Sequence, residues 1–208
     1  TEGVIVNTHF RFLGSELKAL GFQVVRGEQI PDEPALFRRS LDRAAAEAEL
    51  VVVTGGLGPT SDDLTREAVA GASGVELEFR EELWRGLQQR YGSSGQRLPE
   101  PNRRQAFVPR GFQVLANDWG TAPGFFGRLA SGACLAALPG PPAELQTMFR
   151  QRLLPLLGRH FPWLAAQEEL AGTALLTPES ALEECLLRHR RAEVNWSTRV
   201  DEDRIAFS

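Results

Sequence analysis

The stretch LVVVTGGLGPTSDDLTRE, residues 50–67, decides the fold class. Residues 50–53 form a short apolar run bounded by polar residues and glycines, a pattern typical of a strand buried on both faces in a parallel sheet. This run leads directly into a loop with three glycines, and we expect a helix to follow from residue 61 or 62 to about residue 72. The unit therefore predicts an α/β layered domain whose glycine loop lies beyond the carboxyl end of a strand.

The alternation of strands and helices continues on both sides of this unit. Asn7 or Thr8 can cap a first helix, whose apolar residues recur at helical spacing until Gly21. The other expected elements are a strand at 22–25, helices from 31 to 48 and from 79 to 91, a β-hairpin at 125–129 and 133–138, and a helix entered through the prolines at 139–142.

The composition of the chain changes after residues 161–162. The last 45 residues predict a short strand at 173–176, a helix at 179–191 and a weakly alternating tail. We therefore expect two domains, an α/β domain at 1–163 and a small α+β appendage at 164–208. Only two residues precede the apolar run that begins at Gly3, so we expect the first strand of the α/β domain to be missing.

Composition excludes several functional classes. The 208 residues carry a formal net charge of −4, which argues against a broad interface with nucleic acid. No run approaches the ~20 apolar residues of a membrane span, and no secretory signal opens the chain. Two widely separated cysteines, Cys134 and Cys185, are typical of a cytoplasmic protein with reduced thiols, and Cys134 reads as core. We expect a small-molecule ligand, and neither a nucleic-acid nor a membrane partner.

The glycine loop has the properties of an anion site. Glycines allow positive φ and a close approach of the backbone to a ligand, and unpaired N–H groups at a following helix attract negative charge. Asp62 and Asp63 stand at the expected start of that helix. They can act simply as favourable helix-terminal charges, or they can hold a divalent metal that bridges them to a phosphate.

Five segments carry a family resemblance, and a sixth extends it. TGGLGPTSDDLTREAVA at 54–70 resembles the signature of the N-terminal domain of the CinA family (competence/damage-inducible protein), part of the molybdopterin-binding-like superfamily. GVIVNTHFRFL at 3–13, NRRQA at 102–106, NDWGTAPG at 117–124 and LPGPPAELQTMF at 138–149 resemble further family motifs, and residues 178–183 resemble the start of its small linking domain. His9 replaces a family asparagine. The deamidase domain of long members has no counterpart, so the chain resembles a short member.

The resemblance implies a three-layer molybdopterin-binding-like domain with a mostly parallel sheet. It also implies metal-dependent hydrolysis of a nucleotide-sugar diphosphate, ADP-ribose to AMP and ribose 5-phosphate, with Mg²⁺, Mn²⁺ or Co²⁺, by a homo-oligomer. Asp63 would be the metal ligand and Asp62 a second ligand or water-orienting base. The residues expected to line the ligand pocket are Asn7, Thr8, Thr54, Gly55, Gly56, Gly58, Thr65, Thr121, Gly124, Pro139, Gly140 and Pro141.

A different functional class fits the same loop. The chain could bind or transfer molybdopterin or a related pterin nucleotide without hydrolysis, with the loop holding the phosphate. A third interpretation is a degenerate, regulatory or structural member.

Several side chains also allow two interpretations. Arg103 and Arg104 could face phosphates or solvent, Asn117 could hold a ligand or a turn, and Trp119 could stack on a base, although core packing is favoured. We expect Glu67 at the surface.

Overall fold

A computed structural model describes residues 7–93, 95, 97–162, 172–175, 178–189, 198–201 and 204–207. The chain divides into two compact units. Unit 1 contains residues Thr1–Lys18 and Phe22–Leu164, and unit 2 contains Ala19–Gly21 and Ala165–Ser208. Each unit is described by itself, and unit 1 carries the glycine loop.

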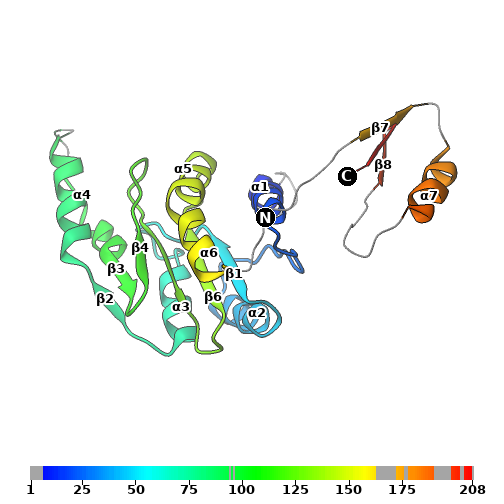
Figure 1. Cartoon of the computed structure of the whole chain (residues 1–208). Coiled ribbons are helices and arrows are strands. Elements are labelled where there is room, and N and C mark those ends of the chain that lie inside the picture. Colours follow the sequence, from blue (N-terminus) through cyan, green and yellow to red (C-terminus); the bar gives the residue numbers. More distant parts are fainter. Residues whose placement is uncertain are drawn as a thin grey trace. The chain divides into compact units, whose positions relative to one another are not determined.

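A four-stranded sheet forms the centre of unit 1 (Figure 1). Its strand order is β1 (Leu50–Thr54), β6 (Cys134–Leu138), β5 (Gly124–Arg128) and β4 (Gln113–Leu115). Strands β1 and β6 run parallel, whereas β5 is antiparallel to both β6 and β4. The α/β class is confirmed, but the expectation of a mostly parallel sheet is wrong for the described residues. A connection as short as that between β5 and β6 can join only antiparallel neighbours.

Helices cover both faces of this sheet. Helices α2 (Pro34–Glu47) and α3 (Thr65–Ser73) supply Leu41 and Val69 to the buried cluster that includes Phe125 of β5. On the other face, the ring of Phe126 lies 4.9 Å from that of His160. That layer contains α1 (Thr8–Ala19), α5 (Pro142–Met148), the π-helical turn η2 (Phe149–Leu153) and α6 (Leu154–His160).

A smaller substructure lies beside the sheet. Strands β2 (Leu77–Phe79) and β3 (Phe107–Pro109) pair antiparallel. They are accompanied by helix α4 (Glu81–Ser93) and the 3-10 helix η1 (Glu100–Ala106), which is the NRRQA segment. Residues of η1 reach the glycine loop, as described below.

The structure confirms most of the expected elements near the sheet and corrects two of them. Asn7 caps α1, because its side-chain oxygen accepts a hydrogen bond of 2.9 Å from the Phe10 N–H. The expected strand at 22–25 is absent, and Val25 there is 59% exposed. Strand β1 is half-buried rather than buried on both faces, since it ends the strand order among the described residues. The expectation of a missing first strand concerns residues outside the described ranges.

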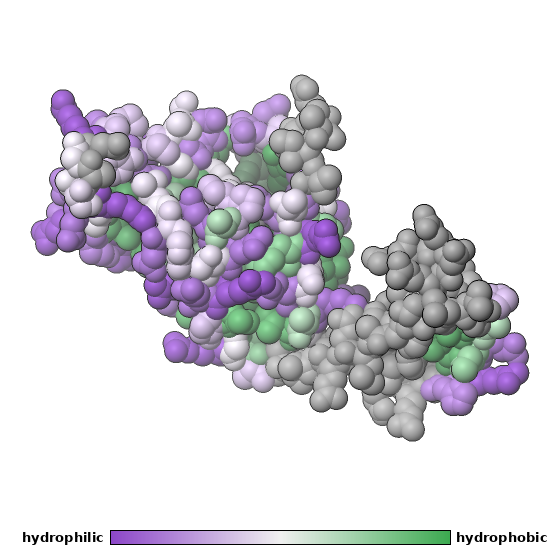
Figure 2. All heavy atoms as spheres, turned by 90° about the horizontal axis from the view of Figure 1, so that it is seen from above, coloured by the Kyte–Doolittle hydropathy of each residue, from purple (hydrophilic) through white to green (hydrophobic). Residues whose placement is uncertain are grey.

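Unit 2 contains a three-stranded antiparallel sheet in the order β7 (Gly172–Leu175), β9 (Arg204–Phe207) and β8 (Thr198–Asp201). Its helix, α7, spans Glu179–Arg188, and the last two residues of the expected helix at 179–191 lie outside the described residues. Within the described residues, no helix is long and apolar enough to cross a membrane. Hydrophilic side chains cover much of the face of unit 1 shown in Figure 2, with small hydrophobic areas between them.

Candidate functional site

The first two carbonyl groups of the glycine loop are bound by a single residue. The Thr65 hydroxyl donates a hydrogen bond of 2.8 Å to the carbonyl oxygen of Gly55, and the Thr65 N–H donates one of 3.2 Å to that of Gly56. Both glycines have positive φ, +88° and +65°. A Cβ atom on Gly56 would lie 2.4 Å from the Thr65 hydroxyl oxygen, so this contact requires glycine.

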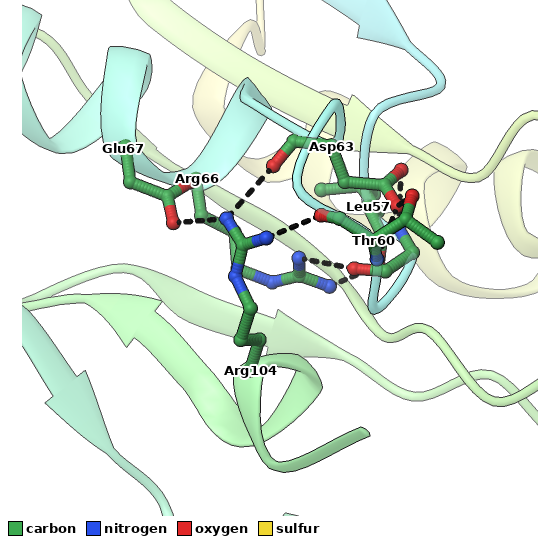
Figure 3. A network of polar contacts seen from close by, with 7 residues as sticks. Leu57, Thr60, Asp63, Arg66, Glu67 and Arg104 are labelled. Carbon is green, nitrogen blue, oxygen red and sulfur yellow. Dashed lines mark hydrogen bonds and ion pairs between the residues drawn. The ribbon is translucent and has the colours of Figure 1, made fainter. Parts of the chain in front are cut away.

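The next two carbonyl groups are bound by the buried Arg66. This side chain is only 1% exposed, and its guanidinium donates to the carbonyl oxygen of Leu57 and, over 3.1 Å, to that of Gly58 (Figure 3). Burial lowers the pKa of Arg66 to about 10, so it stays protonated at neutral pH. The sequence pattern gave no sign that this arginine would be buried. The guanidinium of Arg66 thus places a positive charge against the carbonyl groups of the loop.

The carboxylate of Asp63 holds the end of the loop through hydrogen bonds. One carboxylate oxygen accepts a hydrogen bond of 2.8 Å from the Gly58 N–H, and the other accepts from the Thr60 N–H at 2.9 Å and hydroxyl at 2.5 Å. Burial opposes ionisation, but the hydrogen bonds from Thr60 and Gly58 outweigh it and lower the pKa of Asp63. Helix α3 begins only at Thr65. The expectation that Asp62 and Asp63 start the helix is therefore wrong.

Arg104 ties the loop to η1. Its guanidinium donates to the carbonyl oxygens of Thr60 and Asp63 and forms an ion pair of 2.8 Å with Glu67 (Figure 3). These contacts occupy the side chain, whereas the guanidinium of Arg103 lies 4.7 Å from the centre of the Phe79 ring. Neither arginine therefore adopts the phosphate-facing role considered from the sequence. Glu67 lies at the surface, as expected.

Two N–H groups of the loop remain unbound. The Gly55 N–H donates to the carbonyl oxygen of Leu138 over 3.0 Å, and the Gly58 N–H is held by Asp63. Among the described residues, the N–H groups of Gly56 and Leu57 have no acceptor. The loop thus keeps two free donors while all four of its carbonyl oxygens are occupied.

The loop forms one wall of a cavity of about 260 Å³. Eight of the residues expected at the ligand pocket or as metal ligand line it. These are Gly55, Gly56, Gly58, Asp63, Thr121, Pro139, Gly140 and Pro141. The backbones of the two walls meet closely, because a Cβ atom on Gly140 would lie 3.6 Å from the Gly55 Cα.

The other expected site residues do not line this cavity. Asn7 caps α1, which begins at Thr8. The Thr54 hydroxyl oxygen lies 3.2 Å from Nδ1 of His9. Gly124 packs against Met148 of α5. Thr65 supports the loop through the hydrogen bonds already described, and Asp62 is exposed.

Three lining residues were not expected from the sequence: Leu57, Gln105 and Glu144. Ala122 also lines the cavity, within the segment 121–124 that was expected to form a wall. Gln105 is 1% exposed, and its amide accepts from Asn102 over 3.0 Å and donates to the Thr121 hydroxyl over 3.1 Å. The NRRQA and GPPAEL segments that contain Gln105 and Glu144 were recognised as motifs. Each of these two polar residues lies within an ordinary helical pattern, which does not indicate that its side chain lines a cavity.

The loop at 117–122 forms a further wall, and its turn is held by Asn117. The side-chain oxygen of Asn117 accepts from the N–H groups of Trp119 and Gly120, and its amide group donates to the Ala122 carbonyl oxygen over 2.8 Å. Asn117 therefore has the turn role. Trp119 is 44% exposed, so the favoured core position is wrong.

In the described part of the chain, the carboxylates near the loop are not gathered into a cluster of metal ligands. The described residues include no group of three or more histidines, cysteines, aspartates or glutamates that could hold one. The two oxygens of Asp63 already accept three hydrogen bonds, and Asp62 lies outside the cavity. A Mg²⁺ ion takes six oxygen ligands in near-octahedral geometry. Asp63 keeps only one free acceptor site, and the free oxygens of Asp62 lie outside the cavity.

Comparison with known proteins identifies the family. The domain family described as "Probable molybdopterin binding domain" matches residues 1–159. The CinA-like protein of Solibacter usitatus is 42% identical over 157 residues, which are 76% of this chain and 38% of that protein. The CinA-like protein of Deinococcus deserti is 41% identical over 155 residues, 74% of this chain and 39% of that protein. The chain thus spans less than half the length of these relatives.

Solved structures agree with this match. The protein CinA from Thermoplasma acidophilum, whose function is described as unknown, superposes with a TM-score of 0.66 at 31% identity. The superposition covers 76% of this chain and 90% of that one. A molybdopterin biosynthesis protein from Mycobacterium abscessus shares the fold with a TM-score of 0.50 at 16% identity, over 78% and 87% of the two chains.

These findings correct the main functional expectation. The matched family is described by molybdopterin binding, which contradicts the expected metal-dependent hydrolysis of ADP-ribose and favours the pterin alternative. The resemblance to CinA is confirmed by the relatives and by the Thermoplasma structure. The chain belongs to the probable molybdopterin binding domain family, as one of its CinA-like members.

Proposed function

We propose that this chain binds molybdopterin or a related pterin nucleotide through its phosphate, as a binding or transfer module without hydrolase activity. One observation carries the proposal. Thr65 and Arg66 occupy all four carbonyl oxygens of residues 55–58, while the N–H groups of Gly56 and Leu57 stay free in the cavity wall. A loop that offers donors and hides its acceptors is suited to an anion.

Electrostatics supports the same ligand class. The Arg66 guanidinium is buried against the back of the loop, and a charge with low exposure is screened less by salt than a surface charge. Its neighbour Asp63 carries the opposite charge, but that carboxylate is already hydrogen-bonded to the loop itself. A phosphate at the free N–H groups would thus be close to a buried positive charge, which favours its binding.

Calorimetric titration of the purified chain tests this proposal. Inorganic pyrophosphate probes the phosphate site, and the phosphate ester of 6-hydroxymethylpterin probes the whole cavity. We expect both to bind, the pterin ester more tightly, and ADP-ribose with Mg²⁺ to release no AMP. Lack of binding by both probes, or AMP release that Asp63→Ala abolishes, would contradict the proposal. Arg85→Met, which removes a guanidinium on the distant helix α4, is a control that should bind like the wild type.

Two broader proposals accompany this one. We propose that the chain forms a homo-oligomer, supported by large apolar side chains at the surface such as Phe10 and Val25, which are 50% and 59% exposed. A mass of 22.9 kDa in light scattering, the mass of the monomer, would contradict this proposal.

We also propose a cytoplasmic location, supported by the free thiols of Cys134 and Cys185. Fractionation of the native host cell tests this location.

A further inference from the structure

Glu144 places a carboxylate in the wall of the same cavity, apart from the glycine loop. It lies in the first turn of α5 and packs against the loop at 117–122. Oε2 accepts a hydrogen bond of 2.7 Å from the amide group of Asn117. A Cβ atom on Gly120 would lie 1.9 Å from the same oxygen, so the carboxylate packs directly against this glycine. The hydrogen bond from Asn117 thus orients the carboxylate.

The second oxygen of Glu144 is open. Among the described residues, Oε1 has no hydrogen-bond donor, whereas the hydrogen-bonding groups of Asn117 are all engaged. Asn117 holds its orientation through four contacts, two as acceptor and two as donor. The side chain that binds Glu144 is thus itself held in place, and Oε1 of this cavity-lining residue remains available as an acceptor.

Thr121 adds a hydroxyl group to the wall of the same cavity. Its hydroxyl oxygen accepts from Gln105, whose amide orientation is set by the hydrogen bond from Asn102. The hydroxyl proton of Thr121 is then free to be donated. The cavity wall consequently presents an oriented carboxylate and a hydroxyl donor, in addition to the N–H groups of the glycine loop.

We propose that Glu144 determines specificity by accepting hydrogen bonds from the 2-amino and N3–H groups of a 2-amino-4-oxo ring, while Thr121 donates to the 4-oxo oxygen. This proposal rests on the proposed function and extends it from the phosphate to the ring. A pterin carries this edge, and its two adjacent N–H donors suit one carboxylate. Oε1 accepts from one of them, and Oε2 accepts from the other at the acceptor site that Asn117 leaves free. In adenine an N–H donor adjoins a ring nitrogen lone pair, which would face the carboxylate and be repelled.

The experiment is a calorimetric titration of wild type and Glu144→Gln with three probes. These are inorganic pyrophosphate, the phosphate ester of 6-hydroxymethylpterin, and the matching lumazine ester, in which a carbonyl replaces the 2-amino group. The wild type should prefer the pterin to the lumazine. Glu144→Gln should bind the pterin ester about ten- to a hundredfold more weakly, because hydrogen bonds to a charged partner are among the stronger ones. Its affinity for pyrophosphate should stay within about twofold.

Each other outcome has a distinct meaning. Equal losses for pyrophosphate and the pterin ester in Glu144→Gln would show a merely structural role and overturn the proposal. Tight binding of pyrophosphate without any preference for the pterin would overturn the ring assignment while leaving the phosphate site intact. Failure of both pyrophosphate and the pterin ester to bind the wild type would overturn the proposed function as well. Glu82→Gln, on the exposed face of α4, is the matched control and should bind like the wild type.

Discussion

The guanidinium of Arg66 lies 3.1 Å from the carbonyl oxygen of Gly58, eight residues earlier in the chain. The same group also binds the carbonyl of Leu57, so one buried side chain fixes the second half of the glycine loop. This contact joins the helix that follows the loop to the loop itself. Removal of the Arg66 side chain should therefore loosen the loop.

Arg66→Met should destabilise the fold by about 2–4 kcal/mol, because two buried carbonyl groups lose their donors and Asp63 loses a favourable positive charge. Arg66→Lys keeps the charge but cannot donate in the same fork, so an intermediate loss is expected. Urea unfolding measures both. Arg85→Met, whose side chain is 75% exposed, should change stability by less than about 0.5 kcal/mol. Equal effects of the Arg66 and Arg85 substitutions would refute the assigned role.

Gly56 packs against Thr65, the residue that supports the first half of the loop. Gly56→Ala should destabilise the protein by about 1–3 kcal/mol and weaken pyrophosphate binding at least tenfold, because a Cβ at positive φ would push the Thr65 hydroxyl away. Gly86→Ala is the matched control. It lies within α4 with no atom close to the new methyl group, and should stabilise by up to about 1 kcal/mol. A Gly56→Ala variant that is as stable as the wild type would contradict the geometry.

The substitution Asp63→Asn distinguishes a role of this residue in supporting the loop from a role in binding a metal. An amide oxygen keeps part of the hydrogen bonding to Gly58 and Thr60, so we expect a loss of about 1–2 kcal/mol in stability. Pyrophosphate affinity should change by only a few-fold, with or without Mg²⁺. If the variant kept full stability but lost all binding in the presence of Mg²⁺, Asp63 would be a metal ligand after all. Titration calorimetry and thermal unfolding on the same samples provide the two readouts.

The stability difference between wild type and Asp63→Asn should depend on pH. The pKa of Asp63 is lowered below its ordinary 3.8 in the folded protein. A depressed pKa contributes stability that is present above the ordinary pKa and is lost as the pH falls through the folded value. The difference should therefore be constant from neutral pH to about pH 5 and shrink below about pH 4. Denaturant unfolding at several pH values measures it, and a difference that grows in acid would be the opposite of this expectation.

Local sequence signals predicted the elements around the site. The apolar run at 50–53, the hairpin that gives β5 and β6, and the proline entry to α5 are each specified by neighbouring residues. The strand expected at 22–25 failed because its apolar residues alone do not supply a pairing partner. The fold class and the cavity-lining glycines were thus accessible from sequence patterns.

The roles of particular side chains were less accessible. Asp63 precedes a helix, and the same residue type is favoured both in a first helical turn and in the turn before it. The structure selects the turn, because Gly58 and Thr60 offer N–H groups to the carboxylate. Burial of Arg66 and the position of Glu144 depend on contacts with segments far along the chain, which no local pattern encodes.

The way in which Thr65 and Arg66 hold the loop has a consequence for binding kinetics and entropy. Four carbonyl groups are fixed before any ligand arrives, so the loop is preorganised and little conformational entropy remains to be lost on association. A phosphate that reaches the free N–H groups of Gly56 and Leu57 meets its final geometry at once. Association should then proceed without a slow rearrangement step, and differences in affinity among ligands should appear mainly in how fast they leave.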